Sequence, residues 1–150
     1  MRAVIQKVEK ADLTVDGIQH AAIGHGLVIL LGIEDVDSHE DIQWLAGKIS
    51  RLRVFNDEMD VMNLSVQDVA GELMVISQFT LHASTKKGNR PSYIRAAKPD
   101  HAIYMYEAFV REIKQESGCN VVSGVFGAYM KISLVNDGPV TIIIDTKKKE

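Results

Sequence analysis

The sequence has little of what stabilises very small proteins or anchors a chain in a membrane. It has one cysteine, Cys119, so no internal disulfide can form, which is compatible with a reducing compartment. No apolar run approaches the roughly 18 residues that cross a bilayer. The N-terminal stretch MRAVIQKVEK carries charges where a signal peptide would be apolar. We therefore expect a soluble, cytoplasmic protein that has no membrane partner.

Motifs for metals, nucleotides and serine nucleophiles are also missing. The histidines show no ligand spacing with Cys119 or the carboxylates, so we expect no metal site. No Walker or Rossmann glycine motif occurs, and we expect no cofactor. Ser77 stands between Ile76 and Gln78 instead of the glycines of a nucleophile elbow. A triad of Ser77, His82 and a distant carboxylate stays open, because geometry and not chain order defines a triad.

The composition that is present is typical of one globular domain. The chain has 150 residues, of which 46% are hydrophobic and 25% charged, enough to bury a core without metal or disulfide. Net charge is −3, but no acid occurs between Glu72 and Asp100. The cations of this interval are Lys86, Lys87, Arg90, Arg95 and Lys98. Such a segment either neutralises phosphates or is a solvated loop whose acids lie elsewhere on the surface.

Hydrophobic periodicity predicts strands at both ends of the chain and two helices between them. AVIQKVEKADLTV, IQHAAIG and GLVILLGI are expected strands, and Asp16-Gly17 marks a hairpin. GELMVISQF, NVVSGVFG, MKISLV and VTIIID are the others. Ser38 begins a helix through an S-x-x-D capping box, and Pro99-Asp100 begin another. We expect one α+β domain over residues 1–150, with a mostly antiparallel sheet or small β-barrel and two covering helices.

The second helix and the stretch before it also carry specific expectations. The helix is expected to end at Gly118. Its predicted buried stripe is Ile103, Tyr106, Phe109, Val110 and Ile113. The preceding TLHASTKKGNRPSYIRAAK has no clear period over about nineteen residues, and loops of that length are usually functional or disordered.

Two short motifs lie at unusual places in this pattern. SQFTL, Ser77 to Leu81, comes where an apolar strand runs into the basic loop. Unpaired N–H groups at such a strand end can donate to an oxyanion, although an ordinary strand end with Phe79 in the core is the alternative. NDGPVT, Asn136 to Thr141, interrupts an apolar region with Gly138-Pro139. Glycine and proline are poor strand residues, so a turn between two strands is the simplest interpretation.

SQFTL followed by TKKGNRPSY and then by NDGPVT resembles the D-aminoacyl-tRNA deacylase family. AVIQKV and GLVILLGI are similar as well, so the resemblance covers essentially the whole chain. It implies hydrolysis of the ester that joins a D-amino acid to the 3′ end of tRNA. It also implies a homodimer with each active site at the subunit interface, and we expect no DNA partner.

The resemblance also implies roles for individual residues. Ser77, Gln78, Phe79 and Thr80 would be the catalytic wall of the site. The Gly138-Pro139 pair would be cis and would reach across from the other subunit as a gate for substrate chirality.

Further roles concern the cations and one histidine. Lys7 stands where the family more often has an arginine that supports the gate, and lysine lacks arginine's planar fork. His82 replaces a small residue and is expected to face solvent. The residues expected to contact acceptor-stem phosphates are Lys86, Lys87, Arg90 and Arg95.

A gate made of backbone can select the hand of the substrate. Carbonyl oxygens beside the α-carbon would meet a hydrogen of a D-residue but the side chain of an L-residue. Glycine should pass, so glycyl-tRNA is an expected side substrate.

For the bond-breaking step, Thr80 could be a nucleophile if a base assists it. The resemblance favours the alternative, in which water attacks with help from the tRNA 2′-hydroxyl while the N–H of Phe79, together with that of Thr80, holds the oxyanion.

Two rival functions stay open at this point. A non-catalytic RNA-binding module would need the basic loop but neither Ser77-Gln78 nor Gly138-Pro139. A conventional serine esterase would use Ser77 as a covalent nucleophile.

Overall fold

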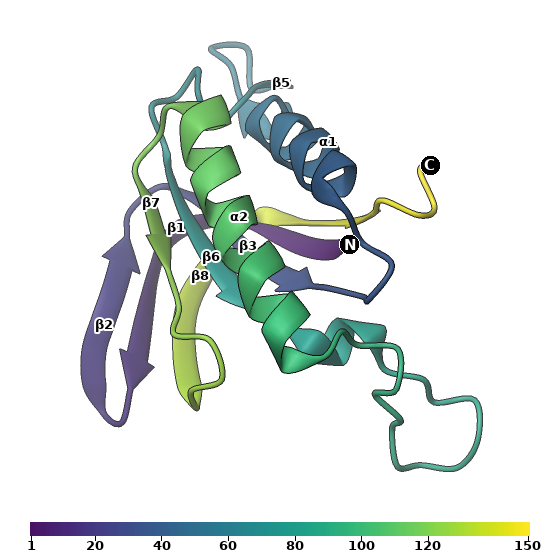
Figure 1. Cartoon of the computed structure of the whole chain (residues 1–150). Helices are drawn as coiled ribbons and strands as arrows, with labels where there is room; N and C mark the ends of the chain where they lie inside the picture. The colour runs from purple at the N-terminus through teal and green to yellow at the C-terminus, as the bar shows by residue number, and fades with distance from the viewer.

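A curled six-stranded sheet forms the centre of the molecule. The computed structural model describes all residues from Met1 to Glu150. The strand order is β2-β1-β3-β6-β7, and β8 pairs with β1, which closes the sheet toward a barrel (Figure 1). The bounds of the sheet strands are β1 Arg2–Val15, β2 Ile18–Ile23, β3 Gly26–Gly32, β6 Glu72–Ser77, β7 Val121–Ser123 and β8 Met130–Asp145. This confirms the predicted fold class.

The remaining elements are two α-helices, a short 3-10 helix and a small hairpin. Their bounds are α1 His39–Ser50, α2 Pro99–Ser117, η1 Phe79–His82, β4 Phe55–Asn56 and β5 Met62–Leu64. The pairs β1–β2, β1–β3 and β1–β8 are antiparallel, whereas β3–β6 and β6–β7 are parallel. Neither α-helix could span a membrane.

Local sequence signals set several element ends as predicted. Asp16 and Gly17 have φ of 52° and 76°, the left-handed pair that a tight hairpin between β1 and β2 requires. The Ser38 N–H donates to the Asp41 carboxylate at 2.8 Å and starts α1. Pro99 occupies the first turn of α2, and Gly118 at φ 66° caps its end.

The buried stripe of α2 differs from the predicted one at Ile103, which is 37% exposed, and at Val110, which is half-buried. The buried residues of this face are Ala102, Met105, Tyr106, Phe109 and Ile113. They follow an i, i+3, i+4 series that starts at Ala102 and leaves Ile103 one position outside it.

Two hydrophobic clusters lie on opposite sides of β6. Leu73 and Val75 belong to the larger cluster, which the helices cover. Met74 and Ile76 belong to the smaller one, inside the curl of the sheet. The strand is therefore central, as its apolar character on both faces predicts.

The predicted strand GELMVISQF is too long at its C-terminal end. Ser77 forms the last pair of β6, with Leu31, and β3 ends one residue later at Gly32. With no neighbouring strand left to pair with, Gln78 leaves the ladder and Phe79 begins η1. The SQFTL motif thus lies on a strand-to-helix corner.

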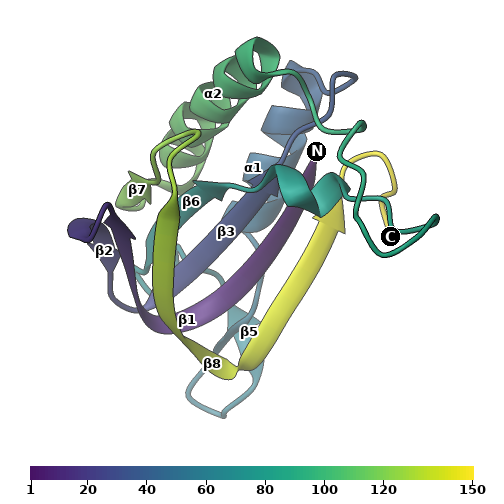
Figure 2. The ribbon, with the colours of Figure 1, turned by 90° about the horizontal axis from the view of Figure 1, so that it is seen from below.

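The interpretation of NDGPVT as a turn between two strands is wrong. β8 runs through the motif along a single partner, β1, with Val8 opposite Asn136 and Gln6 opposite Thr141. Between these two pairs, Lys7 of β1 faces four residues of β8, 137–140, so the motif is a wide bulge. β8 bends sharply at this bulge, at the point where the colour of the strand turns from green to yellow (Figure 2). The Asn136 amide closes the bulge by donating to the carbonyls of Lys7, at 2.9 Å, and Val140, at 3.0 Å. The Gly138-Pro139 peptide bond is cis.

Ion pairs connect both ends of the chain to the start of α1. The Met1 ammonium contacts Asp37 and also donates to Thr146 at 2.8 Å. Lys147 Nζ donates to Asp41 at 2.7 Å. Burial opposes ionisation of Asp41, but hydrogen bonds from Lys147, Thr146 and the Ser38 N–H outweigh it, so the pKa of Asp41 lies well below its usual range.

This lowered pKa predicts how Asp41→Asn changes stability with pH. The pKa of Asp41 is lower in the folded protein than in the unfolded chain, where it is near 4. The ionised carboxylate therefore stabilises the fold fully above about pH 4, and this stabilisation is lost as the pH falls toward the folded-state pKa. At pH 7 we expect the substitution to cost about 1 to 2 kcal/mol, with Tm falling about 2 to 4 °C per kcal/mol. Thermal unfolding at pH 7 and pH 3 should show the difference shrinking in acid.

Glu40→Gln, an exposed acid of the same helical turn, is the matched control and should change Tm little at either pH. An Asp41→Asn effect of equal size at pH 7 and pH 3 would contradict this explanation.

Candidate active site

A cavity of about 520 Å³ lies beside the SQFTL corner. The end of β6, η1, the segment that returns from the basic loop, the start of α2 and the β7–β8 connection surround it. Ser77, Gln78 and Phe79 line it, so the structure brings these predicted site residues together. Thr80, which follows them on η1, is half-buried.

Aromatic side chains give this cavity its character. Phe79 is 57% exposed, so the alternative that it belongs to the core is wrong. Its ring meets the ring of Tyr93 edge to face, with centroids 5.0 Å apart. Phe126 and Tyr129 complete the aromatic lining, and Tyr129 is 80% exposed. Flat apolar walls of this kind can hold a planar, partly apolar ligand.

The first turn of η1 presents free hydrogen-bond donors. The Gln78 N–H donates to Leu31 O and the Leu81 N–H to Gln78 O, but the N–H groups of Phe79 and Thr80 have no acceptor in the chain. The start of a helix leaves such groups unpaired because no earlier turn supplies carbonyls. Two adjacent N–H groups beside a cavity can stabilise a developing oxyanion, so the arrangement can support ester cleavage.

The Thr80 hydroxyl already accepts a hydrogen bond from the Gln78 side-chain amide. A nucleophilic hydroxyl needs a base that takes its proton. No histidine or carboxylate contacts Ser77 or Thr80 through a hydrogen bond. Neither hydroxyl is therefore activated as a nucleophile in this arrangement.

His82 does not face solvent, contrary to expectation. Its side chain is 0% exposed, and Nδ1 lies 3.5 Å from Glu34 Oε1. On its other side the ring packs over Gly32, where an added Cβ would come within 3.0 Å of Cδ2 and Nε2. Neither ring nitrogen has a hydrogen-bond partner. The Ser77–His82–carboxylate triad is thus not formed, because the buried His82 ring makes no hydrogen bond to Ser77.

The predicted phosphate contacts fall into two groups. Lys86, Lys87 and Arg90 are exposed on a loop that projects from the body of the molecule below η1 and α2 (Figure 1). Arg95 lies apart from them and donates to Glu34 Oε1 through Nε at 3.0 Å and Nη2 at 2.8 Å.

Gly138 and Pro139 are exposed but do not line the cavity of their own chain. Lys7, the predicted gate support, is 6% exposed, and its Nζ lies 3.2 Å from the carboxylate of Asp137, the neighbour of Gly138. Its ammonium also lies 6.0 Å from the Phe55 ring. Lys7 therefore contacts the bulge that carries Gly138, while the bulge and the cavity are separate within one chain.

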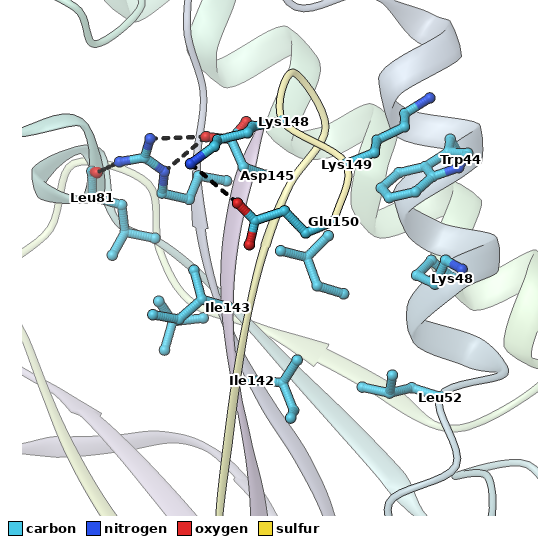
Figure 3. Close-up of a pocket in the computed structure, with 13 residues that line it drawn as sticks. Trp44, Lys48, Leu52, Leu81, Ile142, Ile143, Asp145, Lys148, Lys149 and Glu150 are labelled. Carbon is cyan, nitrogen blue, oxygen red and sulfur yellow. Dashed lines mark hydrogen bonds and ion pairs between the residues drawn. The ribbon is translucent and has the colours of Figure 1, made fainter.

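A second cavity, of about 770 Å³, lies on the other side of η1, between β8 and α1 (Figure 3). Arg2 connects its edges: Nη1 donates to Leu81 O at 2.7 Å and Nη2 to Asp145 at 2.8 Å. Ile143, which is 69% exposed, also lines this cavity. This surface was not predicted from the sequence, although the alternation in VTIIID places the side chain of Ile143 on the other face of the strand from Ile142 and Ile144.

No group of three or more His, Cys, Asp or Glu side chains is placed to hold a metal ion. The polar and aromatic groups at the candidate site are backbone donors, hydroxyls, the Gln78 amide and aromatic rings.

Comparison with known proteins identifies the family. The model of the family described as D-Tyr-tRNA(Tyr) deacylase matches residues 4–145. D-aminoacyl-tRNA deacylases of Flavobacterium johnsoniae and Parabacteroides distasonis are each 61% identical over 150 residues, covering 100% of this chain and of theirs.

Two solved structures share the fold. The c-Myc DNA unwinding element binding protein has a TM-score of 0.90 at 38% identity, covering 97% of this chain and 98% of its own. A probable eukaryotic D-amino acid tRNA deacylase has a TM-score of 0.81 at 16% identity, covering 95% and 97%, which is a likeness of fold alone.

The chain belongs to the D-aminoacyl-tRNA deacylase family, which confirms the resemblance seen in SQFTL and NDGPVT. It is an ester hydrolase that deacylates D-aminoacyl-tRNA.

Proposed function

We propose that the aromatic cavity beside SQFTL is the active site, and that Gly138-Pro139 of a second subunit completes it. The observation that carries the proposal is the pair of free N–H groups, of Phe79 and Thr80, beside a cavity of about 520 Å³. The tetrahedral oxyanion formed when water attacks the ester would accept from both groups.

The terminal adenosine of tRNA would occupy the cavity. Its volume is within the usual range for small-molecule sites. Proteins commonly hold unstacked RNA bases against aromatic faces, and Phe79, Tyr93 and Phe126 supply them. The ester at the ribose 3′ position would then lie near the start of η1.

Water, and not Thr80, would be the nucleophile. The hydrogen bond that Thr80 accepts from Gln78 and the absence of a base near either hydroxyl support this choice. The 2′-hydroxyl next to the ester would assist the attacking water. Gln78 would orient Thr80, whose O–H remains free to donate to the substrate. A covalent Ser77 intermediate lacks the base that it needs, which disfavours the serine esterase.

A homodimer would bring Gly138-Pro139 to the cavity of the other chain. Gln6 pairs with Thr141 and Val4 with Ile143, and opposite residues of an antiparallel pair point to one face. We call these four residues the outer face. Gly138-Pro139 lie at one end of it, and η1 lies at the other, where Arg2 bonds Leu81.

A two-fold axis through the middle of the outer face would exchange its two ends. The Gly138-Pro139 bulge of one subunit would then meet η1 of its partner, and the same contact would form twice. The exposed Ile143 would be covered at the centre of this interface.

At the site, carbonyl oxygens of the bulge would lie beside the substrate α-carbon. A D-residue would offer them a hydrogen, whereas an L-residue would drive its side chain into them. Glycine has no side chain and would pass, so glycyl-tRNA would be a second substrate. Lys7 and Asn136 would support this geometry, since both contact the bulge from β1 and β8.

The projecting loop would contact the acceptor stem. Lys86, Lys87 and Arg90 are exposed and form no ion pair within the chain. Phosphate contacts hold RNA in place without reading its sequence, which suits an enzyme that acts on many tRNAs. We assign this role to the three loop cations and leave Arg95 to its pair with Glu34.

Hydrolysis of D-Tyr-tRNA, L-Tyr-tRNA and Gly-tRNA tests the gate. We expect the purified protein to hydrolyse the D-tyrosyl and glycyl esters and to leave the L-tyrosyl ester intact. Gly138→Ala should slow D-Tyr-tRNA hydrolysis about 100-fold, as small displacements at an active site do. Gly138 has φ 130°, and an added Cβ would lie 2.7 Å from Val140 Cγ2.

Gly24→Ala is the matched control, because an added Cβ there meets only Glu72 Oε2 at an ordinary 3.5 Å. Its rate should equal that of the unmodified protein. Hydrolysis of L-Tyr-tRNA at a rate comparable to D-Tyr-tRNA would refute the gate.

Ile143→Asp tests the dimer. A buried charge at the centre of the outer face should prevent association and lower D-Tyr-tRNA hydrolysis by at least about tenfold. Ultracentrifugation gives the mass, the deacylation assay gives the rate, and circular dichroism checks that the variant is folded.

Ile18→Asp is the control, because Ile18 is 73% exposed on β2, outside the outer face. It should remain dimeric and active. If Ile143→Asp also stays dimeric and active, the subunits associate through another surface.

A further inference from the structure

Glu34 is a buried carboxylate next to the proposed site that does not line the cavity. Its side chain is 11% exposed. One of its oxygens, Oε1, accepts both hydrogen bonds from Arg95 and lies 3.5 Å from His82 Nδ1. Asp37 holds the Glu34 backbone by accepting from its N–H at 2.8 Å. Glu34 is therefore held in place and contacts residues of two other segments.

The two segments are opposite walls of the cavity. His82 is the last residue of η1, and Phe79 at the start of η1 lines the cavity. Arg95 directly precedes Ala96 and Ala97, which also line it. Residues 83–92 form the loop between the walls, and one backbone pair, Ser84 with Ser92, closes this loop at its base. Apart from this pair, the walls contact each other through the rings of Phe79 and Tyr93.

Packing makes the His82 end of this connection rigid. The ring is fully buried and lies over Gly32, at the end of β3. A displacement of η1 would therefore move His82 against β3 or away from Glu34. On the other wall, the Ala97 N–H donates to Ile33 O at 2.8 Å, next to Glu34 in the chain.

We propose that Glu34 is a positioning residue for deacylation, which sets the spacing between the η1 wall and the Tyr93–Ala97 wall through His82 and Arg95. The inference rests on the proposed function, which places the tRNA 3′ end between these walls. Because Glu34 does not touch the cavity, it acts on binding through the walls and not on the reacting atoms. Its loss raises KM and leaves kcat nearly unchanged.

Steady-state kinetics with D-Tyr-tRNA at fixed salt and pH test this role. Glu34→Gln keeps an acceptor but loses the charge, and we expect KM to rise about threefold; Glu34→Ala loses both, with an expected rise of about tenfold. We expect kcat to stay within about twofold in each. A partly unfolded preparation lowers the apparent kcat but not KM, so a raised KM distinguishes positioning from a general loss of folding.

Arg95 offers a second, independent readout. If Arg95 instead bound tRNA phosphate, removing the Glu34 charge would release it for that contact and KM would fall. Under the positioning role Arg95→Gln also raises KM. The Glu34→Gln/Arg95→Gln double variant raises KM no further than the larger of the two single substitutions, because each substitution removes the same contact between Glu34 and Arg95. Glu116→Gln is the matched control, since Glu116 accepts from Arg51 between α1 and α2, away from the cavity.

An unchanged or lowered KM in both Glu34 variants, or additive effects in the double variant, overturns the inference. Tyr93→Ala separates this failure from a failure of the proposed site, because Tyr93 lines the cavity directly. If Tyr93→Ala raises KM while the Glu34 variants do not, only the role of Glu34 is wrong. If none of them changes KM, substrate binds elsewhere and the proposed function is also wrong.

Discussion

The antiparallel pairing of β1 with β8 places the Gly138-Pro139 bulge relative to η1. It extends from Arg2–Asp145 to Val15–Met130, and β1 also pairs with β2 and β3. Near its middle the ladder opens into the Gly138-Pro139 bulge, which Asn136 closes with two hydrogen bonds. At its end Arg2 bonds both Asp145 and the Leu81 carbonyl of η1. The β1–β8 ladder thus carries the bulge and, through Arg2, contacts η1.

In the proposed site the hydrogen-bonding groups near the ester would be mainly backbone groups. Phe79 and Thr80 offer N–H groups because η1 begins where β6 loses its neighbouring strand. Charged groups act from outside the cavity: Glu34 contacts the two walls, and Lys7 contacts the bulge. Under the proposed function, a site built from backbone donors and carbonyls would sense the hand of the α-carbon without contacting the amino-acid side chain.

Local signals made much of the fold predictable from the sequence. Asp16-Gly17, the Ser38 cap and Pro99 each act within a few residues, and each marks the predicted element end. The course of β8 was not predictable, because the bulge depends on contacts such as Asn136 to Lys7, 129 residues apart. The burial of His82 likewise depends on Gly32, in a strand far away in the sequence. Ser77, Gln78 and Phe79 could be predicted to lie together because they are contiguous, whereas the surroundings of Glu34 and Ile143 form only on folding.

A mixed dimer tests most directly whether each active site is shared between two subunits. Phe79→Pro removes one oxyanion N–H, and Gly138→Ala damages the bulge, so each homodimer should be nearly inactive. After the two variants are unfolded together and refolded, random pairing should restore about one quarter of the unmodified rate on D-Tyr-tRNA, because half the dimers then hold one intact site. No recovery, with mixed dimers demonstrated by mass spectrometry, would contradict a gate that acts on the partner subunit.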